Sequence, residues 1–276
     1  MDDTQAPHSW RNGRIPKNRR VYAIGDIHAH PELLQTLLDK IENETSNLPK
    51  GTKAEIVCLG DYIDRGPDGP GTLDVLLRFQ KKLENSPNAS IHFLGGNHEE
   101  FFSRLLKTPR IVDTEYDTSD KYGHLYSTGK GKIQLKGLED FLFLGGGITT
   151  LRDYLKIDPD SNSLFDMNGR RFNAQAPNLL QNINALVREL QETVPESHKA
   201  FFRTAYKNEH KIIGDYLFIH AGIHPDKSLK KQGIGKNRKK LNRREKLAIL
   251  NIRNEFLWAG REVFHDTPYV IVHGHT

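Results

Sequence analysis

The sequence predicts an α/β fold in which buried strands alternate with amphipathic helices. Five runs of four residues, apolar apart from one His, each end in polar, glycine-containing sequence, which is typical of strands buried on both faces. Helical apolar patterns lie between the first runs. The polar residues that follow the first three runs are regularly spaced. Asp26 and Asp61 are 35 positions apart and Asp61 and Asn97 are 36 apart, about the length of one β-α-β unit.

The expected elements follow one another along the chain. The strands are VYAI, IVCL, IHFL, YLFI and YVIV, which precede GDIHAH, GDYIDRG, GGNHEE, HAG and HGHT. Helical apolar patterns occupy residues 31–41, 71–83, 178–192 and 196–206. Residues 110–132 are polar and predict a loop. We expect residues 101–214 to form a helical and loop insertion that packs over one end of the sheet.

Composition excludes several classes of protein. The chain has 276 residues, of which 36% are hydrophobic and 27% charged, so a soluble globular protein with a substantial core is expected. No run of about 18 apolar residues occurs, so no membrane partner is expected. Residues 1–20 form a polar tail without the apolar region of a secretory signal. The single cysteine, Cys58, cannot form an internal disulfide and predicts a cytoplasmic location.

Positive charge is concentrated in one segment. The whole chain carries a net charge of +5, whereas residues 227–246 contain ten Lys or Arg and one Glu, a net charge of +9. The remainder therefore carries −4. This basic segment predicts either a solvated loop or helix face, or a surface that attracts a polyanionic ligand.

Polar side chains gather where the expected strands end. Ligands of α/β sheets bind beyond the carboxyl ends of the strands. The candidates there are Asp26, His28, Asp61, Asp64, Arg65, Asn97, His98, His220, His273 and His275. Taken singly, an Asp could cap a helix, a His could be hydrogen-bonded in the core and an Asn could form a turn. Their recurrence at successive strand ends favours a metal site with oxygen and imidazole ligands.

The motifs GDIH, GDYIDRG, GNHE, HAG and GHT, in this order, resemble the phosphoprotein phosphatase branch of the calcineurin-like metallophosphoesterases. The resemblance covers about 21–276, which we expect to form one metallophosphoesterase domain. FLGGGITTLRDY and PESHKAFFRTAY also resemble the bacterial members, which include protein serine/threonine phosphatases and symmetrical dinucleoside tetraphosphatases. The resemblance implies a central β-sandwich of mixed sheets flanked by helices, with the active site at the carboxyl ends of the strands.

The resemblance also implies two divalent metal ions. Mn²⁺ is favoured, and Fe or Zn would suit the same ligands. The implied ligands are Asp26, His28 and Asp61 for one ion and Asp61, Asn97, His220 and His275 for the other. Asp61 would bridge the two ions, and a hydroxide between them would attack phosphorus.

Four further residues receive roles from the resemblance. His98 would be the general acid that protonates the leaving oxygen, and Asp64 would orient its ring. Arg65 would bind the phosphoryl oxygens. Arg253 would be a second phosphoryl contact if LNIRNEFL matches the tryptophan-containing WIR segment of the bacterial members, although Asn251 stands where tryptophan is usual.

Some positions are assigned no catalytic role or depart from the family pattern. Glu99 and Glu100 are expected to favour the dipole of a helix that they begin. His273 is left out of the metal set. Ala29 stands where glycine is usual, so it either narrows the corner beside the phosphate or is tolerated with a negative φ. Family members continue with further strands after GHT, whereas this sequence ends at Thr276.

The expected function is therefore hydrolysis of phosphoserine or phosphothreonine phosphomonoesters. The leading alternative is a symmetrical bis(5'-nucleosyl)-tetraphosphatase, because the same metal core serves both substrates. A third alternative is a non-catalytic protein that binds phosphate-rich ligands through the basic segment. A phosphorylated protein or a dinucleoside polyphosphate is accordingly the expected partner.

Overall fold

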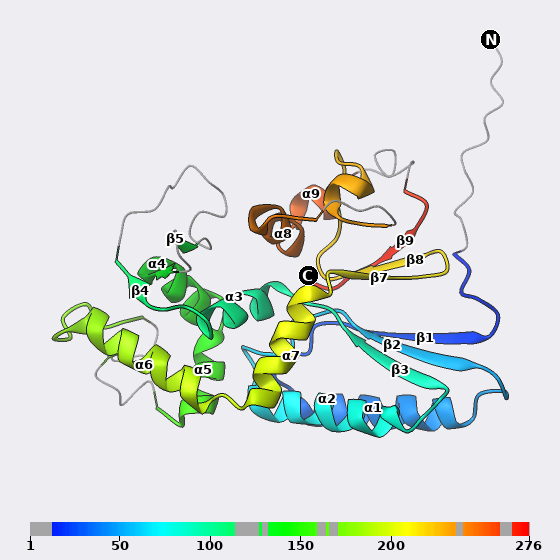
Figure 1. Ribbon diagram of the computed structural model, residues 1–276, viewed down its shortest axis with the longest axis horizontal. Helices are drawn as coiled ribbons and strands as arrows, with labels where there is room; N and C mark the ends of the chain where they lie inside the picture. Colours follow the sequence, from blue (N-terminus) through cyan, green and yellow to red (C-terminus); the bar gives the residue numbers. More distant parts are fainter. Residues whose placement is uncertain are drawn as a thin grey trace, which may run out of the picture.

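A computed structural model describes residues 13–113, 127–128, 132–158, 164–165, 171–235, 240–259 and 267–275. Two three-stranded sheets face each other, and helices cover the outer side of the first sheet (Figure 1). The strands are β1 (Arg19–Ile24), β2 (Lys53–Cys58), β3 (Ala89–Phe93), β4 (Ile111–Val112), β5 (Ser127–Thr128), β6 (Lys132–Gln134), β7 (His210–Ile213), β8 (Tyr216–Ile219) and β9 (Val270–Val272). The predicted α/β fold is confirmed.

The two large sheets differ in strand direction. Strands β1, β2 and β3 are parallel throughout, whereas β7 runs antiparallel to β8 and β9 runs parallel to it. The sandwich thus combines one parallel and one mixed sheet. Val57, Leu59 and Leu94 pack in one cluster with Ile213 and Phe218, which fills the space between the sheets.

The helices of the described chain vary in length from single turns to four turns. They are α1 (Pro31–Ser46), α2 (Gly69–Glu84), α3 (Asn97–Leu105), α4 (Leu135–Glu139), η2 (Asp140–Leu144), α5 (Gly147–Leu155), α6 (Leu179–Thr193), α7 (Glu196–Lys207), η3 (Leu229–Gln232), α8 (Arg243–Leu250) and α9 (Asn254–Leu257). None of the described helices combines the length and apolar character needed to cross a membrane.

Helices α1 and α2 form because leucines recur on one face of each, and that face packs on the sheet. Leu34 and Leu38 of α1 and Leu73 and Leu76 of α2 are buried in the main core. Asp68 caps α2 by accepting a hydrogen bond from the Gly71 N–H at 2.8 Å. The two β-α-β units that the sequence spacing predicts are therefore present, and they fix where β1, β2 and β3 end.

The middle of the chain supplies a helical layer beyond the carboxyl ends of these strands. Helices α3, α4, α5 and α6 lie on that side of the sheet, and α7 returns the chain to β7 (Figure 1). The prediction of a loop over 110–132 is wrong at 111–112, 127–128 and 132, where β4, β5 and β6 form a small sheet. These strands are too short to show a periodic pattern. Residues 114–126 and 129–131 lie outside the described residues.

Candidate metal centre

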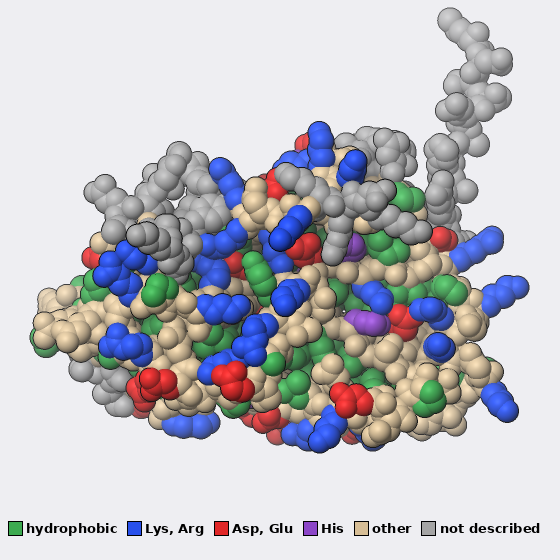
Figure 2. Space-filling model, viewed as in Figure 1, with side chains coloured by type: hydrophobic (Ala, Val, Ile, Leu, Met, Phe, Trp, Pro, Cys, Tyr) green, Lys and Arg blue, Asp and Glu red, His purple; other side chains and the backbone are tan. Residues whose placement is uncertain are grey.

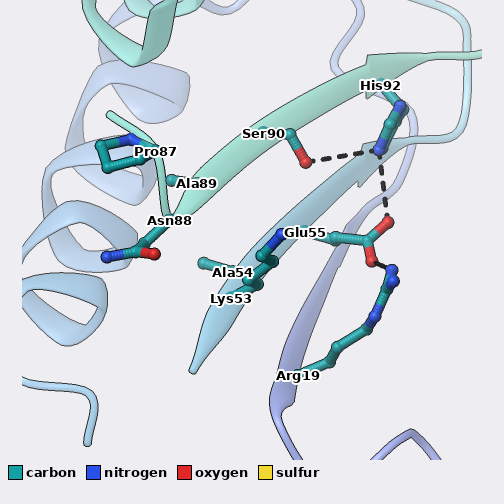
Figure 3. A pocket seen from close by; sticks show the side chains of 9 residues that line it. All are labelled: Arg19, Lys53, Ala54, Glu55, Pro87, Asn88, Ala89, Ser90 and His92. Carbon is teal, nitrogen blue, oxygen red and sulfur yellow. Dashed lines mark hydrogen bonds and ion pairs between the residues drawn. The ribbon is translucent and has the colours of Figure 1, made fainter. Parts of the chain in front are cut away.

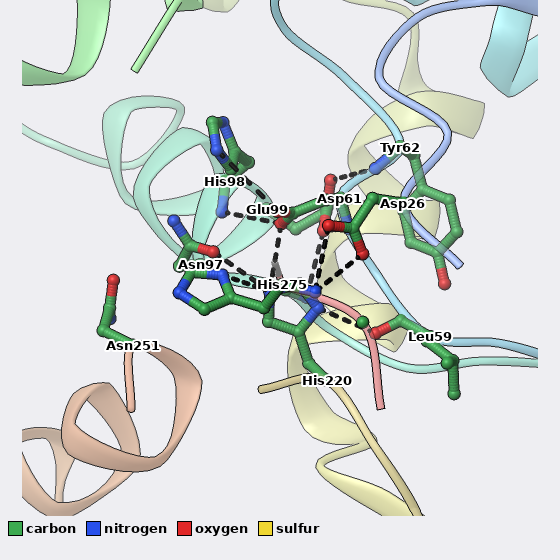
Figure 4. Close-up of polar contacts among 12 residues, drawn as sticks. Asp26, Leu59, Asp61, Tyr62, Asn97, His98, Glu99, His220, Asn251 and His275 are labelled. Atoms are coloured by element: carbon green, nitrogen blue, oxygen red, sulfur yellow. Dashed lines mark hydrogen bonds and ion pairs between the residues drawn. The ribbon is translucent and has the colours of Figure 1, made fainter. Parts of the chain in front are cut away.

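The polar side chains singled out in the sequence come together at one end of the sandwich. Asp26 and His28 follow β1, Asp61 follows β2, Asn97 and His98 begin α3 after β3, and His220 and His275 follow β8 and β9. Parallel strands of one sheet end at the same edge, and the corresponding edges of the two facing sheets lie together, which is why residues so far apart in the chain meet. Figure 4 shows most of them around the carboxylate of Asp61.

Asp61 occupies the centre and is buried, with 1% of its surface exposed. Its Oδ2 lies 3.8 Å from Nε2 of both His28 and His98, and its Oδ1 lies 3.4 Å from Nε2 of His220. Burial alone would raise the pKa of Asp61, but the imidazoles of His220, His98, His28 and His275 lower it. The two oxygens of one carboxylate therefore face two separate groups of imidazoles.

The group on the Oδ1 side joins three elements. Nε2 of His220 lies 3.0 Å from Oδ1 of Asn97 and 3.2 Å from Nδ1 of His275 (Figure 4). Nδ1 of His220 lies 3.0 Å from the Leu59 carbonyl, to which it donates its proton. The Nε2 lone pair then faces the other two ligand atoms, so these electron-rich atoms crowd one point that a cation would stabilise.

On the Oδ2 side, His28 is fixed in the same manner. Its Nδ1 donates to the Ile63 carbonyl at 3.0 Å, which leaves Nε2 as the acceptor. That Nε2 is buried and has no hydrogen-bond partner among the described residues. A buried, unpartnered imidazole nitrogen beside a carboxylate is what a metal ligand looks like without its ion.

Asp61 therefore belongs to two groups of potential ligand atoms. One group includes His28 and His98, the other includes His220 and His275, and within each group the atoms lie within 4.8 Å of one another. Asp26 is in neither group. Its carboxylate accepts the His275 backbone N–H at 3.0 and 3.1 Å, and so connects the loop after β1 to the loop after β9. The donor set of carboxylate, amide oxygen and imidazole fits divalent ions such as Mn²⁺, Fe²⁺ or Zn²⁺.

His98 is almost completely buried, and Asp64 fixes the position of its ring. Its Nδ1 lies 2.7 Å from Oδ2 of Asp64. The other carboxylate oxygen of Asp64 accepts the Thr150 hydroxyl at 2.5 Å, and the Asp64 N–H donates to the same hydroxyl oxygen at 3.0 Å. Burial would lower the pKa of His98, but the carboxylates of Asp61 and Asp64 raise it to about 9. The imidazole is therefore a charged proton donor at neutral pH in the metal-free protein.

The two arginines singled out in the sequence border different parts of the cluster. Nη2 of Arg65 lies 3.5 Å from Nε2 of His98, and its backbone N–H bonds the Gly146 carbonyl at 3.1 Å. Arg253 precedes α9 and is exposed. Burial is the main cause that lowers the pKa of His275 to about 4, and the charges of His220 and then Arg253 lower it further. Figure 4 shows Asn251 away from the cluster around Asp61.

Glu99 has a role that the sequence reasoning missed. Its fully buried carboxylate accepts backbone N–H groups of Asp61 at 2.8 Å, Tyr62 at 2.8 Å and Gly96 at 3.0 Å. It therefore ties the loop after β2 to the loop after β3. Burial and the Asp61 charge raise the pKa of Glu99 to about 8. Only its position three residues after Gly96, typical of a capping-box glutamate, was a signal in the sequence.

The backbone of the centre is strained. Positive φ angles occur at His28 (44°), Ala29 (58°), Asp61 (53°), Asp64 (72°), Arg65 (69°) and His275 (58°). A non-glycine residue in this region costs about 1–2 kcal/mol. Ala29 is fully buried at this positive φ, so tolerance through a negative φ is wrong. Such strain is typical of functional loops that the surrounding packing holds in place.

Comparison with known proteins agrees with this arrangement. The calcineurin-like phosphoesterase family matches residues 19–200, about two thirds of the chain. The chain belongs to the calcineurin-like phosphoesterases, and the resemblance seen in its motifs is confirmed. That family binds divalent metal ions, and the clusters around Asp61 can hold them.

Two curated relatives share shorter stretches. A symmetrical bis(5'-nucleosyl)-tetraphosphatase of Cellvibrio japonicus is 43% identical over 63 residues, which cover 23% of this chain and 21% of that protein. Shewanella-like protein phosphatase 1 of Plasmodium berghei is 33% identical over 104 residues, covering 36% and 28%. The matches thus span less than a third of either relative.

Solved structures of a cold-active protein tyrosine phosphatase are also similar. One, of a mutant, covers 95% of this chain and 69% of its own at 15% identity, with a TM-score of 0.39. Another covers 95% and 67% at 16% identity, with a TM-score of 0.40.

Proposed function

We propose that this phosphoesterase hydrolyses phosphoserine and phosphothreonine phosphomonoesters with the help of two divalent ions. The observation that carries the proposal is the buried carboxylate of Asp61, whose two oxygens face separate imidazole groups at 3.4 and 3.8 Å. A carboxylate in this arrangement can neutralise two cations at once. When bound, such ions activate water and stabilise the charge that develops on the phosphoryl oxygens.

The proposed ligands divide between two ions. They are Asp26, His28 and Asp61 for one and Asp61, Asn97, His220 and His275 for the other. The unpartnered Nε2 of His28 supports the first set, and the crowding of Asn97 and His275 around Nε2 of His220 supports the second. We favour Mn²⁺, while Fe and Zn fit the same donor atoms.

The remaining residues of the centre act on the substrate itself. His98 donates a proton to the leaving oxygen, and Asp64 holds the ring in the orientation that directs Nε2 toward Asp61 and Arg65. Arg65 lies beside that nitrogen and binds phosphoryl oxygens through its forked donors. Arg253, on the His275 side, provides a second contact with the phosphoryl group.

A second candidate substrate is a dinucleoside tetraphosphate cleaved symmetrically. The local 43% identity to a symmetrical bis(5'-nucleosyl)-tetraphosphatase favours it. The basic segment would also attract the polyanionic chain of this substrate. Its exposed cations include Lys227, Lys230, Lys231, Lys240 and Arg244. Figure 2 shows Lys and Arg side chains spread widely over one face of the molecule. The cytoplasmic location inferred from Cys58 stays a prediction.

One comparison of substrates tests these proposals. Phosphate release would be measured from a phosphothreonine peptide and from diadenosine tetraphosphate, with Mn²⁺ and after metal removal. Faster Mn²⁺-dependent turnover of the peptide supports the protein phosphatase, and faster turnover of the dinucleotide supports the alternative. Metal binding without turnover of either substrate would contradict both and favour a non-catalytic protein that binds phosphate-rich ligands.

A further inference from the structure

A cavity of about 250 Å³ lies at the end of the sandwich opposite to the metal centre. Arg19, Lys53 and Ala89 are the first residues of β1, β2 and β3 and line this cavity, together with Glu55, Asn88, Ser90 and His92 among others. Glu55 precedes Asp61 by six residues of mostly extended chain, so the cavity is roughly 20 Å from the metal centre. It is therefore a separate site.

A chain of polar contacts forms one wall of the cavity. Nε2 of His92 lies 3.5 Å from the Ser90 hydroxyl and 3.4 Å from Oε2 of Glu55, while Oε1 of Glu55 pairs with Arg19 (Figure 3). Lys211, on the facing strand β7, lies 3.9 Å from the same carboxylate. The Glu55 side chain is only 6% exposed, so these partners compensate for a buried charge.

The cations exceed this one carboxylate. Arg19, Lys53 and Lys211 carry three positive charges against the single negative charge of Glu55. The pKa of His92 reflects the same excess of positive charge. Burial, followed by the charges of Lys211 and Arg19, lowers this pKa to about 4 although Glu55 is close. Its imidazole is neutral at physiological pH, so its contact with Glu55 is a neutral hydrogen-bonding contact and leaves Glu55 to the cations.

Some hydrogen-bond donors that line the cavity are available to bind a ligand. The Arg19 side chain is 40% exposed, and its five-donor fork exceeds what one carboxylate can accept. Lys53 is exposed, and its ammonium makes no ion pair with any residue that the structure describes. Asn88 and Ser90 add neutral polar groups to the same lining. An anion entering here would replace water around Arg19, which Glu55 already holds in place, and around the exposed ammonium of Lys53.

We propose that this cavity binds a small molecule bearing a phosphate or carboxylate group, with Arg19 and Lys53 as its charged contacts. A guanidinium binds either oxyanion through paired hydrogen bonds, and an ammonium adds a point charge. The volume of about 250 Å³ suits a compact molecule of metabolite size. The proposal concerns binding alone and is independent of the reaction at the metal centre.

Titration of the full chain with two probes tests the proposal. Inorganic phosphate and succinate would be added separately at constant ionic strength, because exposed charges are screened over about 8 Å in physiological salt. The readout is the NMR resonance of the His92 ring, identified by its loss in His92→Gln. We expect the resonance to shift and saturate, and the more effective probe identifies the oxyanion class.

Variants locate the binding to this cavity. Lys53→Gln changes an exposed side chain and should weaken binding about tenfold, as loss of one charge-assisted hydrogen bond does. Arg19→Gln should weaken it at least as much, with its fold verified by circular dichroism. Arg65→Gln, at the metal centre, should leave the His92 response unchanged. A shift that stays linear with both probes, or saturation unaffected by Lys53→Gln, would overturn the proposal.

Discussion

Replacing Glu99 by Ala should destabilise the protein more than most single substitutions. The carboxylate accepts three buried backbone N–H groups, from Asp61, Tyr62 and Gly96, at 2.8 to 3.0 Å. At about 1–3 kcal/mol for each orphaned donor, the loss is about 3–9 kcal/mol, and water entering the vacated space moves it toward the lower value. A domain of this kind has about 5–15 kcal/mol in total.

Glu99→Gln provides a graded comparison. The amide oxygen can replace Oε2, which accepts from Asp61 and Gly96. The amide NH₂ would then face the Tyr62 N–H, donor against donor, so we expect a loss of about 1–3 kcal/mol. Glu192→Ala, an exposed change on α6, should stay within about 0.5 kcal/mol of the parent protein.

The assay is urea unfolding of the metal-free protein near pH 9, where Glu99 is ionised, because its pKa is about 8. Unfolding is followed by circular dichroism, and metal is left out because bound metal would add its own stabilisation. The free energy of unfolding should be highest for the parent protein, lower for Glu99→Gln and lowest for Glu99→Ala. Because Glu99 anchors the loop that carries Asp61, metal affinity should fall in the same order. A loss below about 1 kcal/mol for Glu99→Ala would refute the idea that this carboxylate holds the two loops together.

Four other predictions concern the centre and the basic segment. Asp61→Asn should release both ions with the fold retained; two metals still found by elemental analysis would contradict bridging. His98→Asn should lower kcat by roughly 10²- to 10⁴-fold, and less for nitrophenyl phosphate, whereas an equal loss would exclude an acid role. Thr150→Val should destabilise the protein by about 1.5–3 kcal/mol in urea unfolding, and Thr150→Ser should not. Replacing the cations of 236–240 by Ser should flatten the salt dependence of kcat/KM for a polyanionic substrate; an unchanged slope would exclude electrostatic attraction.

Strand β2 was predictable because burial leaves a plain signature, whereas the apolar runs of β1 and β9 are only partly buried. Ile56, Val57, Cys58 and Leu59 are each at most 2% exposed, as an unbroken apolar run predicts. The same argument covers α1 and α2, whose buried leucines recur at the helical period. The strand-end motifs also predicted which polar residues would meet, since parallel strands bring their carboxyl ends together.

Contacts made through side chains of distant segments were not predictable. Thr150 reaches Asp64 across 86 positions, and nothing in its local sequence marks the hydroxyl as a partner of that carboxylate. Glu99 looks like any acid in the first turn of a helix until its three donors are seen. Sequence periodicity reports burial, whereas these pairings depend on tertiary packing.

The order of the ligands along the chain has a consequence for biosynthesis. Asp26, His28, Asp61 and Asn97 belong to two consecutive β-α-β units, which are synthesised before the rest of the sandwich. His220 bonds Leu59 across 161 positions, and His275 bonds Asp26 across 249. At about 5–20 residues per second of synthesis, the first half of the centre exists for roughly ten seconds or longer before the second half is made. During that interval the nascent chain presents an incomplete set of the proposed ligands, so we expect full metal affinity only when β8 and β9 have joined the sandwich.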